Sequence, residues 1–554
     1  GPYTHYVDNT HPNATDSGNP FGAPDQPRLT IPWDLPAGSV VEIHGGPYTY
    51  GTPTGSRYWT NFSANGSEEM PVFIRGARTG AKPIFRDMSP RLRGQYFIVE
   101  NLDFENSTLS VKYLNGEEPG THHHISFRSS EIRDIPPAYG SGLALSQGRQ
   151  VIAYANHVHD NGDPNYWDEN DLHGFTAGAG AQSVWIIDNH IHGNGGDSVQ
   201  INSGNTDPDN YARHIYIARN VMHGDGENAV DLKQCWDVIV SQNRMYGYTP
   251  TEFAHSGSDG TAMVIHYEPI DVWVIHNEIF GSVNGIRSNG ATRGFILGNL
   301  IHNIHHTNDD YDPSSVWTSG SGIMTWANPE LHVVANTIYD VDAGFSSPGG
   351  GSQAHHVIGN VIADLAEPAH HIAISVSDVA DTSQMHHNLL YEPGGSARIK
   401  WGSSSAIYDL TAFQSAFGKG EGCLDADPQF VNAAAGDFRL RSQGGTISPA
   451  IDAGTSLDYY VDLFASLYGL DIGVDFDGVA RPQGEGVDIG AFEAVEGSPG
   501  ENHPPVAGDD AAETDEDTAV LIDVLDNDTD VDVSDTLSVD SVTQGSHGSV
   551  TTDG

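Results

Sequence analysis

The sequence predicts an all-β protein, a right-handed parallel β-helix, from three observations. A short unit of strand, turn and strand recurs through the middle of the chain. Each unit carries an asparagine at the same place, and successive asparagines lie 22 to 37 residues apart. The 554 residues include 64 glycines and 30 prolines, which suits many turns and little helix. Repeats of this length are typical of solenoids, in which each unit buries its apolar face against the next.

The asparagine of each unit follows a β-rich run, as in IIDNHIHG and VVANTIYD. An asparagine at a sharp bend can bond to the backbone of its own coil and of the next coil. We therefore expect the side chains to stack into a buried ladder. The marker residues are Asn189, Asn220, Asn243, Asn277, Asn299, Asn336, Asn360 and Asn388.

A second strand, opening with a small residue, follows the asparagine in the central units, as in DSVQIN, NAVDLK and TAMVIH. These strands should stack as one parallel sheet. Side chains alternate along a strand, so every second residue points into the core. The predicted core residues are Phe175, Ala177, Val199, Ile201, Val230, Leu232, Met263, Ile265, Ile286 and Ile323.

The remaining side chains of these strands should form two outward columns. Lys233 then lies between its neighbours Asn202 and His266, with Asp231 two residues earlier on the same strand. The predicted columns are Thr176, Gln200, Asp231, Val264, Arg287 and Met324, and then Gly178, Asn202, Lys233, His266, Asn289 and Trp326. This face is the candidate site.

Two domains joined by a linker are predicted along the chain. Residues 1–497 form the β-helix, with a Pro-rich opening that reads as a cap, because solenoids need covered strand edges. The stretches DADPQFVNAAAGDFRL and RPQGEGVDIGAFE look like the closing segment of extracellular bacterial β-helix proteins. Residues 498–505 form a linker. Residues 506–554 resemble the start of a cadherin-like tandem repeat, a partial Ig-like, β-sandwich-like module.

The charge balance excludes several functions. The chain has 24 basic and 74 acidic residues, for a formal charge of −50, which repels nucleic acid and anionic membrane surfaces. No apolar run has the length of a membrane span.

The two cysteines, Cys235 and Cys423, are predicted to be core residues. The chain starts at Gly1 without a signal-like segment, so we expect a processed or recombinant mature form. Other features indicate a secreted or cell-surface protein, and we expect a monomer.

Lys233 carries the chemical argument, since it is the only lysine in the central coils. Elimination in a uronic-acid polymer needs a base that removes the proton at C5, an acid for the oxygen leaving C4, and a cation that neutralises the C6 carboxylate. The predicted catalytic residues are Lys233, His266, Arg287 and Asp231. Lysine, histidine and arginine supply candidates for the base, the acid and the neutralising charge.

Acidic residues lie at the turns that enter these strands. Calcium takes six to eight oxygen ligands, and consecutive coils can supply them without a linear motif. Several of these side chains could therefore surround one cation. They are Asp168, Asp171, Asp197, Asp225 and Glu227.

The stretches ENDLHGFTAGAG, NGGDSVQIN and DGENAVDLKQCWDVIVSQN resemble the β-helix polysaccharide lyases. Both the family-nine pectate lyases and the alginate and chondroitin lyases are similar, and the choice between them stays open. The resemblance implies a pectate-lyase-like solenoid in which Asp197, Glu227 and Asn228 contact Ca²⁺ and Lys233 is the base. The sequence has Gly196 and Asp197 where the family-nine lyases carry paired aspartates.

Substrate contacts are expected from the outward columns and the loops beside them. Tyr211, Tyr267 and Trp326 offer rings that can stack on sugars, and Gln200, Asn202 and Asn289 offer polar groups. The loops after Asn202, before Thr261 and before Ile323 would wall the binding groove. Most of the 28 histidines, among them His190, His192 and His223, are expected not to be metal ligands.

Three functions follow from this pattern. The first is a calcium-dependent lyase that cleaves an acidic glycan in salt water by β-elimination. The second is a β-helix glycoside hydrolase that uses two carboxylates, with Asp231 and Asp197 as candidates. The third is a non-catalytic adhesin or glycan-binding stalk, since fold alone does not imply an activity.

Overall fold

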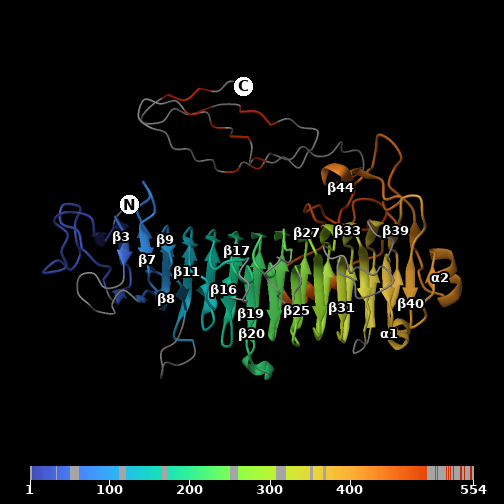
Figure 1. The fold of residues 1–554 in the computed structure, drawn as a ribbon, viewed down its shortest axis with the longest axis horizontal. Helices are drawn as coiled ribbons and strands as arrows, with labels where there is room; N and C mark the ends of the chain where they lie inside the picture. The colour runs from blue at the N-terminus through green and yellow to red at the C-terminus, as the bar shows by residue number, and fades with distance from the viewer. Residues whose placement is uncertain are drawn as a thin grey trace.

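The computed structural model describes residues 3–32, 34–49, 61–111, 120–164, 171–249, 260–306, 320–349, 354–365 and 370–495, and scattered positions between 506 and 551. Three sequence-based expectations fall largely outside these residues: the metal ligand Asp168, the loops before Thr261 and Ile323, and the module at 506–554. The described chain forms a parallel β-helix, as predicted (Figure 1). Each regular coil has three strands, where the sequence predicted two. Adjacent coils pair in parallel, so the stack has three faces.

The first face carries the candidate site. Its strands are β2 (Leu35–Pro36), β5 (Asn61–Asn65), the start of β8 (Arg91–Glu100), β10 (Leu109–Ser110), β13 (Gly140–Ala144), β16 (Leu172–Ala177), β19 (Val199–Asn202), β22 (Val230–Lys233), β25 (Thr261–His266), β28 (Asn284–Asn289), β31 (Ser321–Trp326), β34 (Ala343–Ser347), β37 (Ile372–Ile374) and β40 (Ile399–Trp401). A short strand, β41 (Ile407–Tyr408), pairs with β40 in the antiparallel sense.

The second face follows the first after a turn in each coil. Its strands are β1 (His5–Asp8), β3 (Val40–His44), β6 (Val72–Gly76), the end of β8, β11 (His123–Arg128), β14 (Arg149–Tyr154), β17 (Gln182–Ile187), β20 (Ala212–Ala218), β23 (Cys235–Ser241), β26 (Ile270–Ile275), β29 (Arg293–Leu297), β32 (Glu330–Val334), β35 (Ala354–Ile358) and β38 (Gln384–His386).

The third face consists of shorter strands that follow the marker asparagines. They are β4 (Tyr48–Thr49), β7 (Ile84–Arg86), β9 (Asp103–Glu105), β12 (Glu131–Arg133), β15 (His157–His159), β18 (His190–His192), β21 (Val221–His223), β24 (Arg244–Tyr246), β27 (Glu278–Ser282), β30 (Leu300–Ile304), β33 (Thr337–Val341), β36 (Val361–Leu365), β39 (Leu389–Tyr391) and β42 (Leu424–Asp425).

The interior of the stack is a continuous apolar core. All ten core residues predicted from the strand alternation are at most 1% exposed. Both cysteines are buried and free, as expected. The alternation in the sequence therefore placed the inward side chains of the first face correctly.

The predicted asparagine ladder runs between the second and third faces. The Oδ1 atom of Asn277 accepts hydrogen bonds of 2.9 Å from the backbone N and the Nδ2 of Asn243. Its own Nδ2 donates to Oδ1 of Asn299 at 3.0 Å and to the backbone oxygen of Val240 at 2.9 Å. The ladder also includes Asn156, one coil earlier than predicted. It ends at Sγ of Cys423, which accepts from the backbone N of Asn388.

The two ends of the stack are closed in different ways. At the N-terminal end the predicted cap contains the strand β1, which pairs in parallel with β3 and so belongs to the stack itself. At the far end the helix α2 (Leu410–Phe417) packs Phe413 against Trp401, with ring centroids 5.2 Å apart. A second helix, α1 (Ser377–Thr382), lies beside the last coils (Figure 1).

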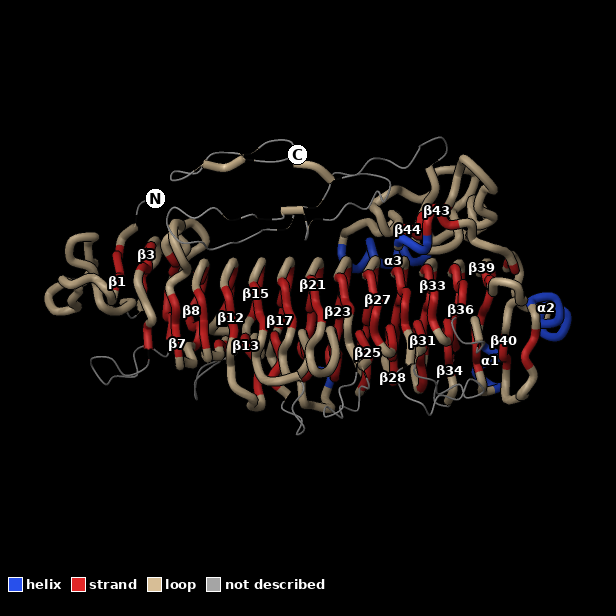
Figure 2. Tube along the Cα trace, turned by 45° about the horizontal axis from the view of Figure 1, so that its top comes forward, coloured by secondary structure: helices blue, strands red, loops and turns tan. Residues whose placement is uncertain are grey.

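The predicted closing segment folds back along the side of the β-helix. It contains β43 (Phe430–Asn432), β44 (Asp437–Leu440), α3 (Asp458–Tyr468) and the 3-10 turn η3 (Ala433–Ala435) (Figure 2). Phe464 and Tyr460 pack on apolar residues of the second face, and Phe438 packs on the third face. Neither of these two clusters contains a described residue of the first face. The outward apolar side chains that the closing segment covers, such as Trp273 and Phe295, belong to the second face.

Within the described residues, none of the helices combines the length and the apolar character that a membrane span requires.

Candidate functional site

The strand register of the first face matches the two predicted columns. Gln200 pairs with Asp231, Asp231 with Val264, Val264 with Arg287 and Arg287 with Met324. In the second column, Lys233 pairs with Asn202 on one side and with His266 on the other. Val264 and Met324 are nevertheless only 4% and 3% exposed, so these two outward side chains are covered, whereas Gln200 and Arg287 in the same column are partly exposed.

Asp231 brings Lys233 and His266 together. Its Oδ2 lies 2.5 Å from Nζ of Lys233, and its Oδ1 lies 2.9 Å from Nε2 of His266. The carboxylate is buried, and both oxygens meet cationic or donor groups, as a buried charge requires. Burial lowers the pKa of Lys233, but the charge and hydrogen bond of Asp231 raise that pKa above its usual value. The resting lysine is therefore an ammonium group.

A cluster of acidic groups lies beside this triad. Donor atoms of His173, Asp197 and Glu227 all lie within 4.8 Å of one another. Asp197 is fully buried, and its Oδ2 is 3.2 Å from Nδ1 of His173. Burial and then the charge of Asp231 raise the pKa of Asp197 well above its usual value. Burial, followed by Asp197 and Asp171, raises the pKa of Glu227 to about 9.

These groups fit a divalent cation. Carboxylates gathered in a buried place must either hold protons or neutralise a positive ion. Asn228 adds a buried amide whose Nδ2 donates 2.5 Å to the backbone oxygen of Thr261, while its Oδ1 has no hydrogen-bond partner among the described residues. Carboxylate and amide oxygens are the ligands of Ca²⁺, whereas the nitrogen of His173 is a donor that transition metals prefer.

His173 is the site residue that the sequence analysis missed. It lies two residues before Phe175 on the same strand, so alternation predicts that its side chain points into the core like those of Phe175 and Ala177. It is 5% exposed, but its Nδ1 accepts a 2.9 Å hydrogen bond from the backbone N of Asp197. A Cβ at Gly196 would lie 2.6 Å from that nitrogen. His173 thus occupies the space that a side chain at 196 would need, where the family-nine lyases have an aspartate.

Asp225 lies apart from this cluster, although the sequence grouped it with the metal ligands. Its carboxylate accepts hydrogen bonds of 2.7 Å from the backbone N and the Nδ2 of Asn194, and also from Ser198 and Tyr248. Asn194 in turn accepts from Asn161. Asp225 therefore ends a second internal ladder, in which burial raises its pKa to about 7.

The aromatic residues that were predicted to stack on sugars differ in how exposed their rings are. Tyr267 is 62% exposed, with its ring centroid 4.3 Å from that of His266, and the Arg287 guanidinium lies 5.8 Å from the centre of the Trp326 ring. Tyr211 is only 2% exposed, so its ring is covered by protein and does not face the site as the sequence predicted.

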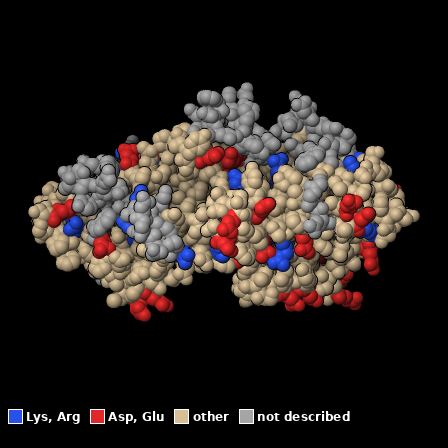
Figure 3. Space-filling view, turned by 90° about the horizontal axis from the view of Figure 1, so that it is seen from below, with Lys and Arg blue, Asp and Glu red and all other residues tan. Residues whose placement is uncertain are grey.

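Two of the polar residues that were predicted to bind substrate form hydrogen bonds within the protein. Gln200 donates 3.1 Å to Oδ2 of Asp197, and Asn202 accepts from the backbone N of Gly204 at 2.9 Å. Asn289 pairs with His266 and is half-buried. Charged side chains of both signs are interspersed over the face seen in Figure 3, so the acidity of the chain does not exclude local cations.

The comparisons with known proteins support the fold. A family model described as Bacterial Ig domain matches residues 502–554. No curated protein matches the sequence. The structure of XylC in complex with xylose is similar with a TM-score of 0.50 and 11% identity, over 89% of this chain and 98% of that one. It shares the fold with this chain.

Two further structures align less closely. Pectate lyase Pel9A has a TM-score of 0.38 and 14% identity, over 89% of this chain and 97% of that one. The GH136 lacto-N-biosidase from Eubacterium ramulus has a TM-score of 0.40 and 14% identity, over 70% of this chain. The alignment spans 64% of the length of that biosidase.

Proposed function

We propose that the protein is an extracellular polysaccharide lyase that cleaves a uronic-acid glycan by calcium-assisted β-elimination. The observation that supports this most is the buried Asp231 carboxylate, which joins Lys233 and His266 on the first face. Next to these groups lies the acidic cluster of Asp197 and Glu227. An amine, an imidazole and a cation site are the groups that this elimination needs.

In the proposed reaction, Lys233 takes the proton from C5 of the uronate. The electrons move to the C6 carboxyl and then form the C4–C5 double bond as the glycosidic oxygen leaves C4. His266 donates a proton to that oxygen, and Asp231 orients both side chains. Arg287 lies two coils from Asp231 in the same column, where it would bind a carboxylate of a neighbouring sugar.

A Ca²⁺ ion, when bound, would neutralise the C6 carboxylate. The residues that would hold it are Asp171, Asp197, Glu227 and Asn228, with His173 beside them. This site also explains how Lys233 can act as a base. Asp197 and Glu227 lie close enough to affect the lysine pKa, and the positive charge of an ion bound between them would lower that pKa.

Sugar binding is assigned to the exposed ring of Tyr267 and to the pair of Arg287 and Trp326. An exposed tyrosine ring offers a flat apolar surface, as sugar rings prefer. Asn202 and Asn289 stand in the same column as Lys233 and offer polar contacts. The protein would act as a secreted monomer, and the Ig-like module would be an accessory unit.

A screen of uronate polymers tests this proposal. Alginate, pectate, ulvan, glucuronan and chondroitin are incubated with the protein, with Ca²⁺ or with a chelator. Elimination creates an unsaturated sugar that absorbs ultraviolet light, and we expect that absorbance to appear with one of these polymers and to fall on chelation. Binding without any cleavage would favour the adhesin alternative instead.

A second candidate function is glycoside hydrolysis. Glu227, with a pKa raised to about 9, would stay protonated at neutral pH and could serve as the general acid, and its carboxyl lies within 4.8 Å of Asp197. Retaining glycosidases place their two carboxyl groups about 5–5.5 Å apart. New reducing ends without the ultraviolet absorbance would favour this candidate.

A further inference from the structure

The third face carries a group of histidines that lies outside the proposed active site. His157 and His159 stand on β15, His190 and His192 on β18, and His223 on β21. The strands are in register, so His157 pairs with His190, and His159 and His223 both pair with His192. Each of these side chains is at least partly exposed, and the closing segment packs on later coils of this face.

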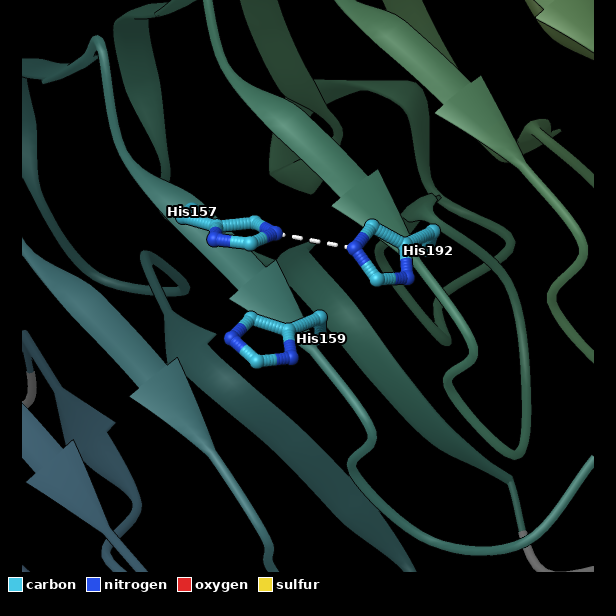
Figure 4. A group of neighbouring side chains, drawn as sticks. All are labelled: His157, His159 and His192. Atoms are coloured by element: carbon cyan, nitrogen blue, oxygen red, sulfur yellow. Dashed lines mark hydrogen bonds between the residues drawn. The ribbon is translucent and has the colours of Figure 1, made fainter. Parts of the chain in front are cut away.

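Two sets of three imidazoles meet the distance that a single ion needs. Donor nitrogens of His157, His159 and His192 lie within 4.8 Å of one another (Figure 4). Donor nitrogens of His190, His192 and His223 do so as well. Nε2 of His157 is 2.8 Å from Nε2 of His192. Two nitrogens bound to one tetrahedral Zn²⁺ lie about 3.3 Å apart, so a small shift of either ring would admit the ion.

Ring stacking explains only some of these histidines. One outward column runs from His159 through His192 and His223 to Tyr246 and Phe280, with successive centroids about 5 Å apart. Tyrosine and phenylalanine serve equally well in that stack. The other column contains His157 and His190, which stack on each other with centroids 4.9 Å apart, but Glu131 and Val221 on either side do not continue the stack. Imidazoles in both columns on adjacent coils are what a metal site requires.

The surroundings favour the set in Figure 4. Asp160 Oδ2 lies 2.8 Å from Nδ1 of His159, and Glu131 Oε1 lies 3.2 Å from its Nε2. A carboxylate on the second nitrogen of a metal-bound histidine orients the ring and strengthens it as a ligand, a role that Asp160 fits. Nε2 of His159 would then exchange its contact with Glu131 for the ion. Lys82 and Arg133 approach Glu131 at 3.8 and 3.3 Å. Among the described residues, no carboxylate forms a hydrogen bond or ion pair with the imidazoles of the other set, His190, His192 and His223.

The donor atoms of this set are all imidazole nitrogens. Imidazole nitrogen is a preferred donor for Zn²⁺, Ni²⁺ and Cu²⁺, and not for Ca²⁺.

We propose that His157, His159 and His192 form a binding site for a divalent transition-metal ion, with Asp160 orienting His159. The ion would join the coil of β15 to the coil of β18. This site is separate from the proposed active site on the first face and does not depend on it.

Zinc titration of the untagged full chain tests the proposal. The protein is first freed of metal, and Ca²⁺ is then kept in excess so that the acidic cluster of the first face is occupied. Calorimetry should detect one Zn²⁺ site. His157→Gln and His192→Phe should each weaken binding about tenfold or more, and Asp160→Asn should weaken it about tenfold. Phenylalanine at 192 preserves the ring stack.

His302→Phe is the matched control, since His302 stacks on Phe280 in the same column, away from the three ligands. It should bind Zn²⁺ like the native chain. His223→Tyr should also retain binding, because it alters only the second set. Loss of binding in His223→Tyr with retention in His157→Gln would overturn the assignment. Zinc affinity that none of these variants changes would overturn it too. Melting temperatures without metal show whether each variant folds.

Discussion

Lys233 Nζ lies 2.5 Å from Oδ2 of Asp231, a carboxylate that is 1% exposed and that also meets His266. The two residues stand two positions apart on β22, so alternation turns both toward the same side of the strand. The lysine therefore lies over the carboxylate, and the pair links the strand pattern to the proposed chemistry.

Lys233→Met should abolish elimination while leaving the fold intact. General acid–base groups contribute about 10²–10⁴-fold to a rate, and we expect a loss in that range. Lys400→Met is the control, because Lys400 lies on β40 of the same face, many coils away. Initial rates of absorbance increase measure the effect. Full activity in the Lys233 variant would rule out its role as the base.

Asp231→Asn should shift the pH–rate profile toward lower pH. The negative charge of Asp231 raises the pKa of Lys233, so its removal makes the neutral amine available at lower pH. The maximum rate should fall as well, since His266 loses the partner that orients it. An unchanged profile with a reduced rate would mean that Asp231 acts only on structure. The profile is measured with Ca²⁺ present throughout.

Glu227 should make the metal-free protein less stable as pH rises. Its pKa is raised from 4.5 to about 9 in the folded chain, so the folded state holds a proton that the unfolded state has released. The free energy of unfolding therefore falls with pH between those two values. Ca²⁺ should replace the proton and raise the melting temperature most at the upper end of that range. Glu227→Gln should flatten the dependence, and calorimetry with chelator or Ca²⁺ measures it.

Asn277→Ala should destabilise the β-helix by about 2–5 kcal/mol. The substitution leaves the backbone N and Nδ2 of Asn243 and the backbone oxygen of Val240 without their partner in the interior. Asn13→Ala, at an exposed position of the N-terminal cap, is the control and should change stability little. Denaturant titration compares the two. Equal effects would mean that the ladder does not carry this stability.

The sequence predicted those parts of the structure that depend on regular alternation. Ile201 and Leu232 point inward, and Asn202, Lys233 and His266 stand in one row, because a parallel stack transmits the register from coil to coil. His173 was not predicted as a site residue, because strand alternation assigns its side chain to the core. Its Nδ1 accepts a hydrogen bond from the backbone N of Asp197, which directly follows the bend at Gly196. Asp225 looked like a surface ligand, but a second polar ladder inside the coil holds it.

The proposed metal site on the third face could not be predicted from the sequence for a similar reason. In the sequence, His157 and His192 are 35 residues apart and belong to no recognisable metal motif. Only the exact pairing of β15 with β18 brings their nitrogens together. Tyr211 shows the opposite case, because its ring was predicted to be available for stacking on a sugar but is only 2% exposed.

The most direct test of the proposed elimination is cleavage of the identified polymer in water enriched in heavy oxygen. Hydrolysis places one oxygen atom of water in the new reducing end, whereas elimination places none. We predict that mass spectrometry of the products will find unsaturated ends and no heavy oxygen gained during cleavage, after correction for exchange in uncleaved sugar. Incorporation of one heavy oxygen for each bond cleaved would contradict the lyase function and leave Glu227 and Asp197 as the catalytic carboxylates.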